Sequence, residues 1–188
     1  MNQKESRRMP GQRGFTLIEL IVFIVIVSVA LAGVLAVLNQ STAHSADPQL
    51  RRQALAIAES LLEEVQLMPF TYCDPDDPGV DTATNAAGCA IPEAIGPEAG
   101  ETRTGAPQFD NVNDYHGFTM AAGISDITGA AVAGLGSYSA SITVQAAALG
   151  SIPAAGDALR ITVTVNGPGN TQVKLEGWRT RYAPNAAF

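Results

Sequence analysis

"GFTLIELIVFIVIVSVALAGVLAVLNQ", residues 14–40, determines how the rest of the chain is interpreted. No charged residue lies between Leu20 and Leu38, and a helix of that length reaches about 28 Å, close to the thickness of a bilayer's hydrocarbon core. A buried core helix is the alternative, but core helices are seldom apolar on every face over such a length. The run therefore predicts a helix that crosses a membrane.

The charges around this run are distributed unevenly. Lys4, Arg7, Arg8 and Arg13 precede it, and no Lys or Arg follows before Arg51. Because positive residues stay on the cytoplasmic side, we expect the N-terminus in the cytoplasm and the rest in the periplasm. The whole chain has a net charge of −7, and the part beyond the basic leader is more acidic still. Nucleic-acid binding is excluded, because a polyanion needs a basic face.

A carboxylate, Glu19, lies at the start of the apolar run. A charge that enters hydrocarbon is costly and usually marks function, although it could also reach back to the headgroups beside Arg13. Three interpretations of the segment remain open at this point. It could be a secretory signal cut near residues 41–43, a permanent anchor, or a segment processed on its cytoplasmic side so that the helix is retained.

The residues Gly14-Phe15-Thr16-Leu17-Ile18-Glu19, after the leader 1–14, resemble the processing site of type IV prepilins and of type II secretion pseudopilins. The resemblance implies that a prepilin peptidase cleaves between Gly14 and Phe15 and methylates the new amino group of Phe15. It also implies that Glu19 of an incoming subunit pairs with the Phe15 ammonium of a docked one, which offsets the desolvation of both ions. The implied partners are the peptidase, other pilin subunits and the assembly platform of the inner membrane.

A second helical stretch is expected to follow the membrane and polymerisation helix of residues 15–40. Over residues 41–69, Asp47 and Pro48 suit the first positions of a helix, and Pro69 ends it. We expect the two stretches to form a nearly continuous helix with a bend around residues 44–48, and a clean break is the alternative. Apolar residues recur at helical spacing and form a face for packing on a sheet: Leu50, Ala54, Ile57, Ala58, Leu61, Leu62 and Val65.

Residues 70–117 are rich in Pro, Gly, Asp and Asn, which predicts loops. Cys73 and Cys89 enclose the segment 74–88. With the cysteines outside the cytoplasm, a disulfide is favoured over free thiols or a metal site. A disulfide around such a loop would contribute about 3 kcal/mol.

Two acidic clusters are candidates for calcium, the only cofactor considered. Calcium takes six to eight oxygens, but neither cluster has EF-hand spacing, and Asp and Asn also build turns. Turn formation is the favoured interpretation, so no firm metal site is predicted. The candidates are Asp74, Asp76, Asp77 and Asp81, followed by Asp110, Asn111, Asn113 and Asp114.

Residues 118–188 alternate as strands do. The stretch 138–145 has one apolar and one polar face, and 158–182 reads as a hairpin with its turn at residues 167–170. An edge strand is expected within 117–128. The predicted fold class is therefore α+β and pilin-like, with a long N-terminal helix, membrane-spanning in its first half, packed on a small antiparallel C-terminal sheet.

The alternation changes phase at Gly177, where we predict a β-bulge. The bulge would place Trp178 and Tyr182 on the apolar side and Arg179 and Arg181 in solvent. A contact site for a sugar or a neighbouring subunit is the alternative interpretation of these four residues, and core aromatics with solvated arginines are favoured.

Several segments, among them "CDPDDPG", "FDNVNDYHGF" and "LEGWRTRYA", resemble the D-type minor pilins of mannose-sensitive haemagglutinin pili. A minor pilin that leaves the inner membrane for an extracellular filament is thus the predicted function. An I-type secretion pseudopilin is the near alternative, and a secreted or membrane-anchored binding module is a further one. An enzyme is not expected, because the chain has no nucleophile elbow and no histidine cluster.

Overall fold

The computed structural model describes residues 14–153 and 156–186, with the side chains of 40–47 left out. Residues 1–13, which include the basic residues of the leader, therefore lie outside the described part, as do the side chains of His44 and Asp47. The chain divides into two compact units, residues 1–45 and 46–188, which are treated separately below.

Helix α1 runs from Leu17 to Leu67 and contains Pro48. The clean break that Asp47 and Pro48 allowed is not observed. Proline removes one backbone donor from a helix, so its presence inside α1 costs a hydrogen bond without ending the element. The helix ends before Pro69, as predicted.

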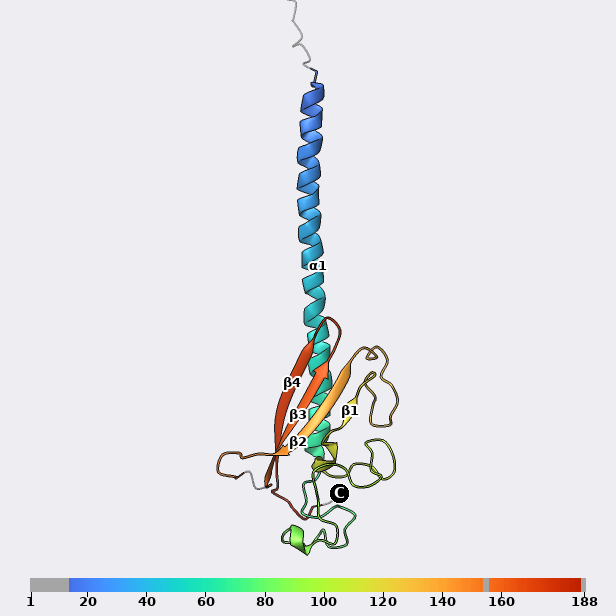
Figure 1. The fold of residues 1–188 in the computed structure, drawn as a ribbon, viewed down its shortest axis with the longest axis vertical. Helices are drawn as coiled ribbons and strands as arrows, with labels where there is room; N and C mark the ends of the chain where they lie inside the picture. Colours follow the sequence, from blue (N-terminus) through green and yellow to red (C-terminus); the bar gives the residue numbers. More distant parts are fainter. Residues whose placement is uncertain (1–13, 154–155, 187–188) are drawn as a thin grey trace, which may run out of the picture. The chain divides into compact units, whose positions relative to one another are not determined.

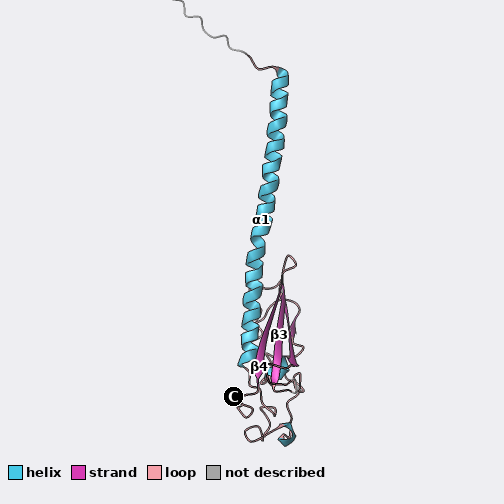
Figure 2. Cartoon of the chain, turned by 90° about the vertical axis from the view of Figure 1, so that its left-hand side faces the viewer, coloured by secondary structure: helices cyan, strands magenta, loops and turns pink. Residues whose placement is uncertain are grey.

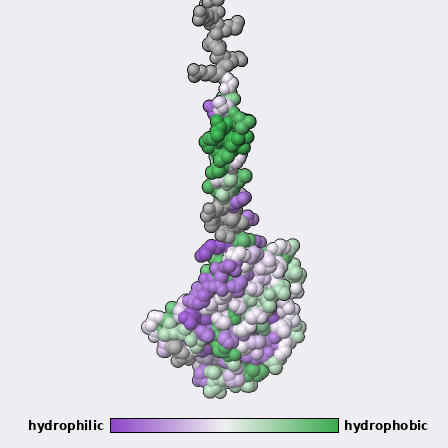
Figure 3. Space-filling view, turned by 45° about the horizontal axis from the view of Figure 1, so that its top comes forward, coloured by the Kyte–Doolittle hydropathy of each residue, from purple (hydrophilic) through white to green (hydrophobic). Residues whose placement is uncertain are grey.

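The first half of α1 is apolar and uncovered. Residues Leu17–Asn39 are long and apolar enough to cross a membrane, and none of this stretch is buried in the described structure. In Figure 3, the visible face of this part of the helix is formed largely by hydrophobic side chains. Ser28 does not need an outside partner, because its Oγ donates to the carbonyl of Ile24 at 2.7 Å.

The head contains one antiparallel sheet of four strands in the order β1-β2-β3-β4. The strands are β1 (Thr119–Met120), β2 (Ser139–Ala146), β3 (Ala158–Asn166) and β4 (Gln172–Thr180). They lie along the part of α1 that belongs to the head (Figures 1 and 2). The predicted α+β, pilin-like class is confirmed, and the predicted edge strand is reduced to the two residues of β1.

The core lies between α1 and one face of the sheet. The strand residues that the alternation placed inward are buried, and so is most of the predicted helical face. Leu62 is half-buried beside the same cluster. The buried members are Ala54, Ile57, Ala58, Leu61 and Val65 on α1, with Ala140, Ile142, Val144, Leu159, Ile161, Val163 and Val165 on the strands.

The bulge predicted at Gly177 is wrong. Strands β3 and β4 pair in one unbroken register, with Gly177 opposite Ile161 and Trp178 opposite Arg160. A Cβ at Gly177 would lie 2.5 Å from Nε2 of Gln66 and 2.8 Å from Cδ1 of Leu62. A side chain at this inward position would therefore have to displace Gln66 and Leu62 of α1, and glycine leaves them their space.

Loops fill the region 70–117, with two short 3₁₀ turns, η1 (Ala86–Gly88) and η2 (Val112–Tyr115). A disulfide joins Cys73 to Cys89. The C-terminal segment holds this disulfide loop: the Asn185 side chain donates to the carbonyls of Val80 and Ala83, at 2.7 Å each.

Candidate functional site

The start of α1 carries a reciprocal cap formed by Thr16 and Glu19. The Glu19 carboxylate accepts hydrogen bonds from the Thr16 backbone N–H at 3.3 Å and from its hydroxyl at 3.4 Å, and the Glu19 N–H donates to Thr16 Oγ1 at 3.4 Å. This arrangement is a capping box, which satisfies backbone donors that a helix start leaves free. A carboxylate in the first turn is also favoured by the helix dipole.

Sequence reasoning missed this role of Glu19. The signal was available, because Thr16-Leu17-Ile18-Glu19 has the Thr-x-x-Glu spacing of a capping box. Glu19 can thus serve its own helix while the carboxylate remains at the surface. Its proposed neighbour Arg13 lies outside the described residues.

The predicted processing residues, Gly14 and Phe15, precede the helix in an exposed segment. Gly14 is exposed and has no atom within 4 Å of where a Cβ would be, and Phe15 is 88% exposed. The backbone at the Gly14–Phe15 bond is therefore accessible to a protease cleft. Phe15 and Glu19, with Leu20 and Phe23, line one shallow hollow at this end of the helix.

The exposed apolar surface of α1 requires a partner. Ile18, Phe23 and Val29 are all more than 60% exposed, and similar values continue to Leu38. Monomeric soluble proteins seldom expose a contiguous apolar surface of this size. A bilayer or a bundle of like helices can cover it.

In the head, Glu64 and Arg103 form a buried ion pair that the sequence did not predict. The Arg103 side chain is 4% exposed and reaches both Glu64 oxygens at 2.7 Å. It also donates to the carbonyls of Ser125 and Asp126, at 3.2 and 2.9 Å. Glu64 is the half-buried end of this pair, and through Arg103 it connects α1 to the loop after β1.

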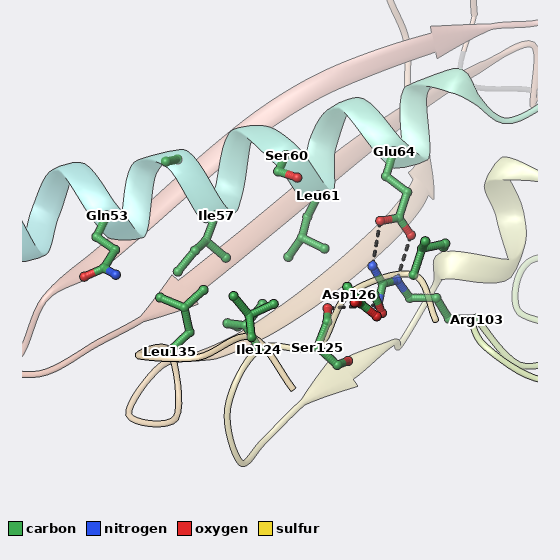
Figure 4. A pocket seen from close by; sticks show the side chains of 13 residues that line it. Gln53, Ile57, Ser60, Leu61, Glu64, Arg103, Ile124, Ser125, Asp126 and Leu135 are labelled. Carbon is green, nitrogen blue, oxygen red and sulfur yellow. Dashed lines mark hydrogen bonds and ion pairs between the residues drawn. The ribbon is translucent and has the colours of Figure 1, made fainter. Parts of the chain in front are cut away.

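The pair lies at one end of a groove of about 520 Å³ in the head. In Figure 4, Ile57 and Leu61 of α1 line one side, and Ile124 and Leu135 line the other. The carboxylate of Glu64 also accepts from the Tyr115 hydroxyl at 2.9 Å. Burial and the Glu64 carboxylate raise the pKa of Tyr115, so this hydroxyl stays a donor.

The structure brings part of the two acidic clusters together. Asp74, Asp76 and Asp110 form one group, in which carboxylate oxygens lie within 4.8 Å of one another. Asp114 joins a second group with Glu93 and Glu98, and Asp74 a third with Glu98 and Glu101. Sequence reasoning missed the three glutamates, because nothing in their spacing indicated that their loops meet.

Asp77 and Asp81 lie outside these groups. The Asp77 carboxylate accepts from the backbone N–H groups of Gly79 and Ile91, at 2.6 and 2.5 Å, which lowers its pKa. Asp77 therefore builds a turn, as the sequence interpretation favoured for these residues.

The residues around Trp178 do not lie as predicted. Trp178 is on the outward face of β4 beside Arg160, and Tyr182 is 74% exposed. The Arg181 guanidinium lies over the ring of Phe70, 4.0 Å from the centroid, and over Tyr72. Arg181 is thus half-buried against aromatic rings and not solvated, because Gly177 keeps the strand in phase.

Residues 9–35 match the family model described as the prokaryotic N-terminal methylation motif. The match supports a class III signal of the type IV prepilin kind, the signal of pilin and pseudopilin subunits. No curated protein and no solved structure matches the chain. The motif contains the Gly14–Phe15 bond, Glu19 and most of the exposed apolar helix.

Proposed function

We propose that this chain is a minor pilin of a type IV pilus of the mannose-sensitive haemagglutinin kind. The observation that supports the proposal is that the methylation motif and the exposed apolar helix occupy the same stretch of the chain. The methylation motif ends in a helix, Leu17–Asn39, of which no part is buried in the described structure. A helix that is apolar on every side can exchange lipid for other helices without changing its own fold.

In this proposal the precursor waits in the inner membrane, with its N-terminus in the cytoplasm and its head in the periplasm. Prepilin peptidase cuts between Gly14 and Phe15 and methylates Phe15. The assembly platform then transfers the subunit into a filament with other pilins. The exposed, open segment before α1 supports the processing step.

Glu19 has two roles in the proposal. In the free subunit it completes the capping box with Thr16. In the filament its negative charge faces the methylated ammonium of Phe15 on a docked subunit. Desolvating one of these ions alone is costly, so the pairing selects the axial register of the incoming helix.

The first test is the N-terminus of the native protein, read by mass spectrometry. We expect a chain that begins at methylated Phe15. A chain that begins beyond residue 40 would support a secreted module, and one that keeps residues 1–14 while in filaments would refute the proposal.

The second test separates the two roles of Glu19. We expect both Glu19→Ala and Glu19→Gln to remain in membranes and to be lost from sheared pili, with Ser28→Ala incorporated normally as a control. Gln can replace Glu in a capping box but carries no charge. If Glu19→Gln assembles as the unchanged protein does, Glu19 acts only through its helix cap and the docking role is wrong.

An I-type pseudopilin of type II secretion remains the second candidate, since the same motif and the same order of helix and small sheet suit it. The location of the protein distinguishes the two. A minor pilin is recovered with sheared surface filaments, whereas loss of a pseudopilin abolishes protein secretion and leaves pili intact.

A further inference from the structure

Six buried or half-buried carboxylates converge in the head from separate stretches of residues 70–117. They fall into overlapping groups whose oxygens lie within 4.8 Å of one another, and Asp74 and Glu98 each belong to two groups. Oxygens bound to one Ca²⁺ lie at most about 5 Å apart. The six are Asp74, Glu93, Glu98, Glu101, Asp110 and Asp114.

Main-chain hydrogen bonds hold these stretches together. The Asp74 N–H donates to the carbonyl of Ile91, and the Glu93 N–H donates to that of Tyr72, both at 3.0 Å. The Cys73–Cys89 disulfide joins the same two stretches. The N–H of Gly96 donates to the Asn113 carbonyl at 3.1 Å, which ties the glutamate stretch to η2. The carboxylates are therefore positioned by backbone and not merely carried on free loops.

Several of these oxygens lack a partner where one is needed. Asp114 is completely buried, and although its Oδ2 accepts from Asn111 N at 2.7 Å, its Oδ1 has no hydrogen-bond partner among the described residues. Both carboxylate oxygens of Glu93 are likewise buried and unpartnered there. Buried polar atoms are almost always hydrogen-bonded or bound to an ion, so these oxygens have a place for a further partner, and a cation would also balance the charge of the neighbouring carboxylates.

No ion pair in the described part of the chain includes one of these six carboxylates. The ion pairs there join Arg103 to Glu64, Lys174 to Glu176 and Arg181 to Asp157.

We propose that the head binds Ca²⁺ at a site centred on Glu93, Glu98 and Asp114. A site made only of oxygens on irregular loops suits calcium, which accepts six to eight ligands in flexible geometry, better than magnesium, which requires a near-ideal octahedron. Zinc prefers nitrogen and sulfur, but the cysteines are joined and His116 Nδ1 accepts from the Val144 N–H at 3.3 Å. The site is independent of how the subunit is processed.

The electrostatic interactions among these carboxylates are consistent with a bound cation. Burial, with the neighbouring carboxylates, raises the pKa of Glu93 to about 9 and that of Asp114 to about 8. Arg181, the cation that faces Glu93, is already engaged with Asp157 and the ring of Phe70. A divalent cation among the carboxylates would favour their ionised forms.

The test uses the full-length protein in detergent, stripped with EDTA and then given CaCl₂ or MgCl₂. We expect Ca²⁺ at about 100 times its Kd to raise the Tm by about 5 °C or more, and Mg²⁺ at the same concentration to have little effect. No rise with Ca²⁺, or an equal rise with Mg²⁺, overturns the proposal.

Two variants make the test specific, because Gln keeps the size of Glu and the carboxylate of Glu93 has no hydrogen-bond partner among the described residues. In Glu93→Gln and Glu98→Gln we expect the calcium-dependent rise in Tm to disappear. The calcium-free Tm should stay the same or increase, since an unpaired negative charge has been removed. Asp81→Asn, an exposed acid of the same region outside the three groups, should keep the full rise. A rise retained in both Gln variants would contradict the site.

Discussion

Replacing Arg103 by Met tests whether one buried ion pair fixes the loop after β1 to helix α1. Arg103 makes two 2.7 Å contacts with Glu64 and two with the carbonyls of Ser125 and Asp126. Met keeps much of the apolar stem but removes every one of these donors. The carboxylate of Glu64 would remain, 18% exposed and without its cation.

The size of the loss follows from what Glu64 keeps. Removing one partner of a buried pair costs about 3–5 kcal/mol. Glu64 retains the Tyr115 hydroxyl and some contact with water, so we take the lower end, about 3 kcal/mol in the free energy of unfolding. For a chain of this size that loss lowers the Tm by roughly 6–12 °C.

The assay is thermal and urea unfolding of the full-length protein in detergent, followed by near-ultraviolet circular dichroism. Lys174→Met is the matched control, because Lys174 makes a 2.8 Å ion pair with Glu176 that is largely exposed, and its loss should have no measurable effect. The double variant Arg103→Met with Glu64→Gln should be less destabilised than Arg103→Met alone. If the double variant is as unstable, the uncompensated charge is not the cause of the loss.

Three further predictions concern the head. Gly177→Ala should lower the free energy of unfolding by about 1–3 kcal/mol through overpacking against α1, measured by urea unfolding, whereas Gly136→Ala, with open space at its Cβ, should not. Replacing Cys73 and Cys89 together by Ser should cost about 3 kcal/mol, and reductant should then have no further effect on the urea midpoint. Without calcium, the Tm should fall as the pH rises from 6 to 9. The pKa of Glu93 is about 9 in the folded chain and 4.5 in the unfolded chain, so over this range the folded state binds more protons than the unfolded state. The contribution of Glu93 to the free energy of unfolding is therefore present at low pH and is lost as the pH approaches 9. In Glu93→Gln this fall should be smaller, and a fall of unchanged size would contradict the assignment.

Much of the fold could be predicted from periodicity. The helical face from Ala54 to Val65 and the alternation of β2 and β3 depend on local sequence, and the buried residues follow it closely. The continuity of α1 through Pro48 was the expected arrangement, but the sequence could not exclude a break, because a proline at a first helical position and one inside a helix look alike in sequence. The β-bulge predicted at Gly177 was wrong for a related reason. A glycine that makes room for a helix interrupts the apolar pattern of a strand in the same way as a bulge.

The functional residues likewise differ in whether a local sequence pattern could predict them. Gly14, Phe15 and Glu19 were accessible to sequence reasoning because the motif is contiguous, and so was the capping box that was overlooked. The pairing of Glu64 with Arg103 and the meeting of Asp74, Glu93, Glu98 and Asp114 were not accessible. These contacts join distant parts of the chain, and no local pattern records which loops come to lie side by side.

The hydrogen bonds between Asn185 and the disulfide loop have a consequence for the order in which the head can fold. Residues 184 and 185 close the loop 73–89 through three hydrogen bonds, one from the Tyr72 N–H to the Pro184 carbonyl and two from Asn185. Both residues follow β4 in the sequence, so these hydrogen bonds can form only after the last strand of the sheet has been made. A chain interrupted before residue 184 can still form the Cys73–Cys89 disulfide, but it lacks the three hydrogen bonds that connect this region to the segment after β4.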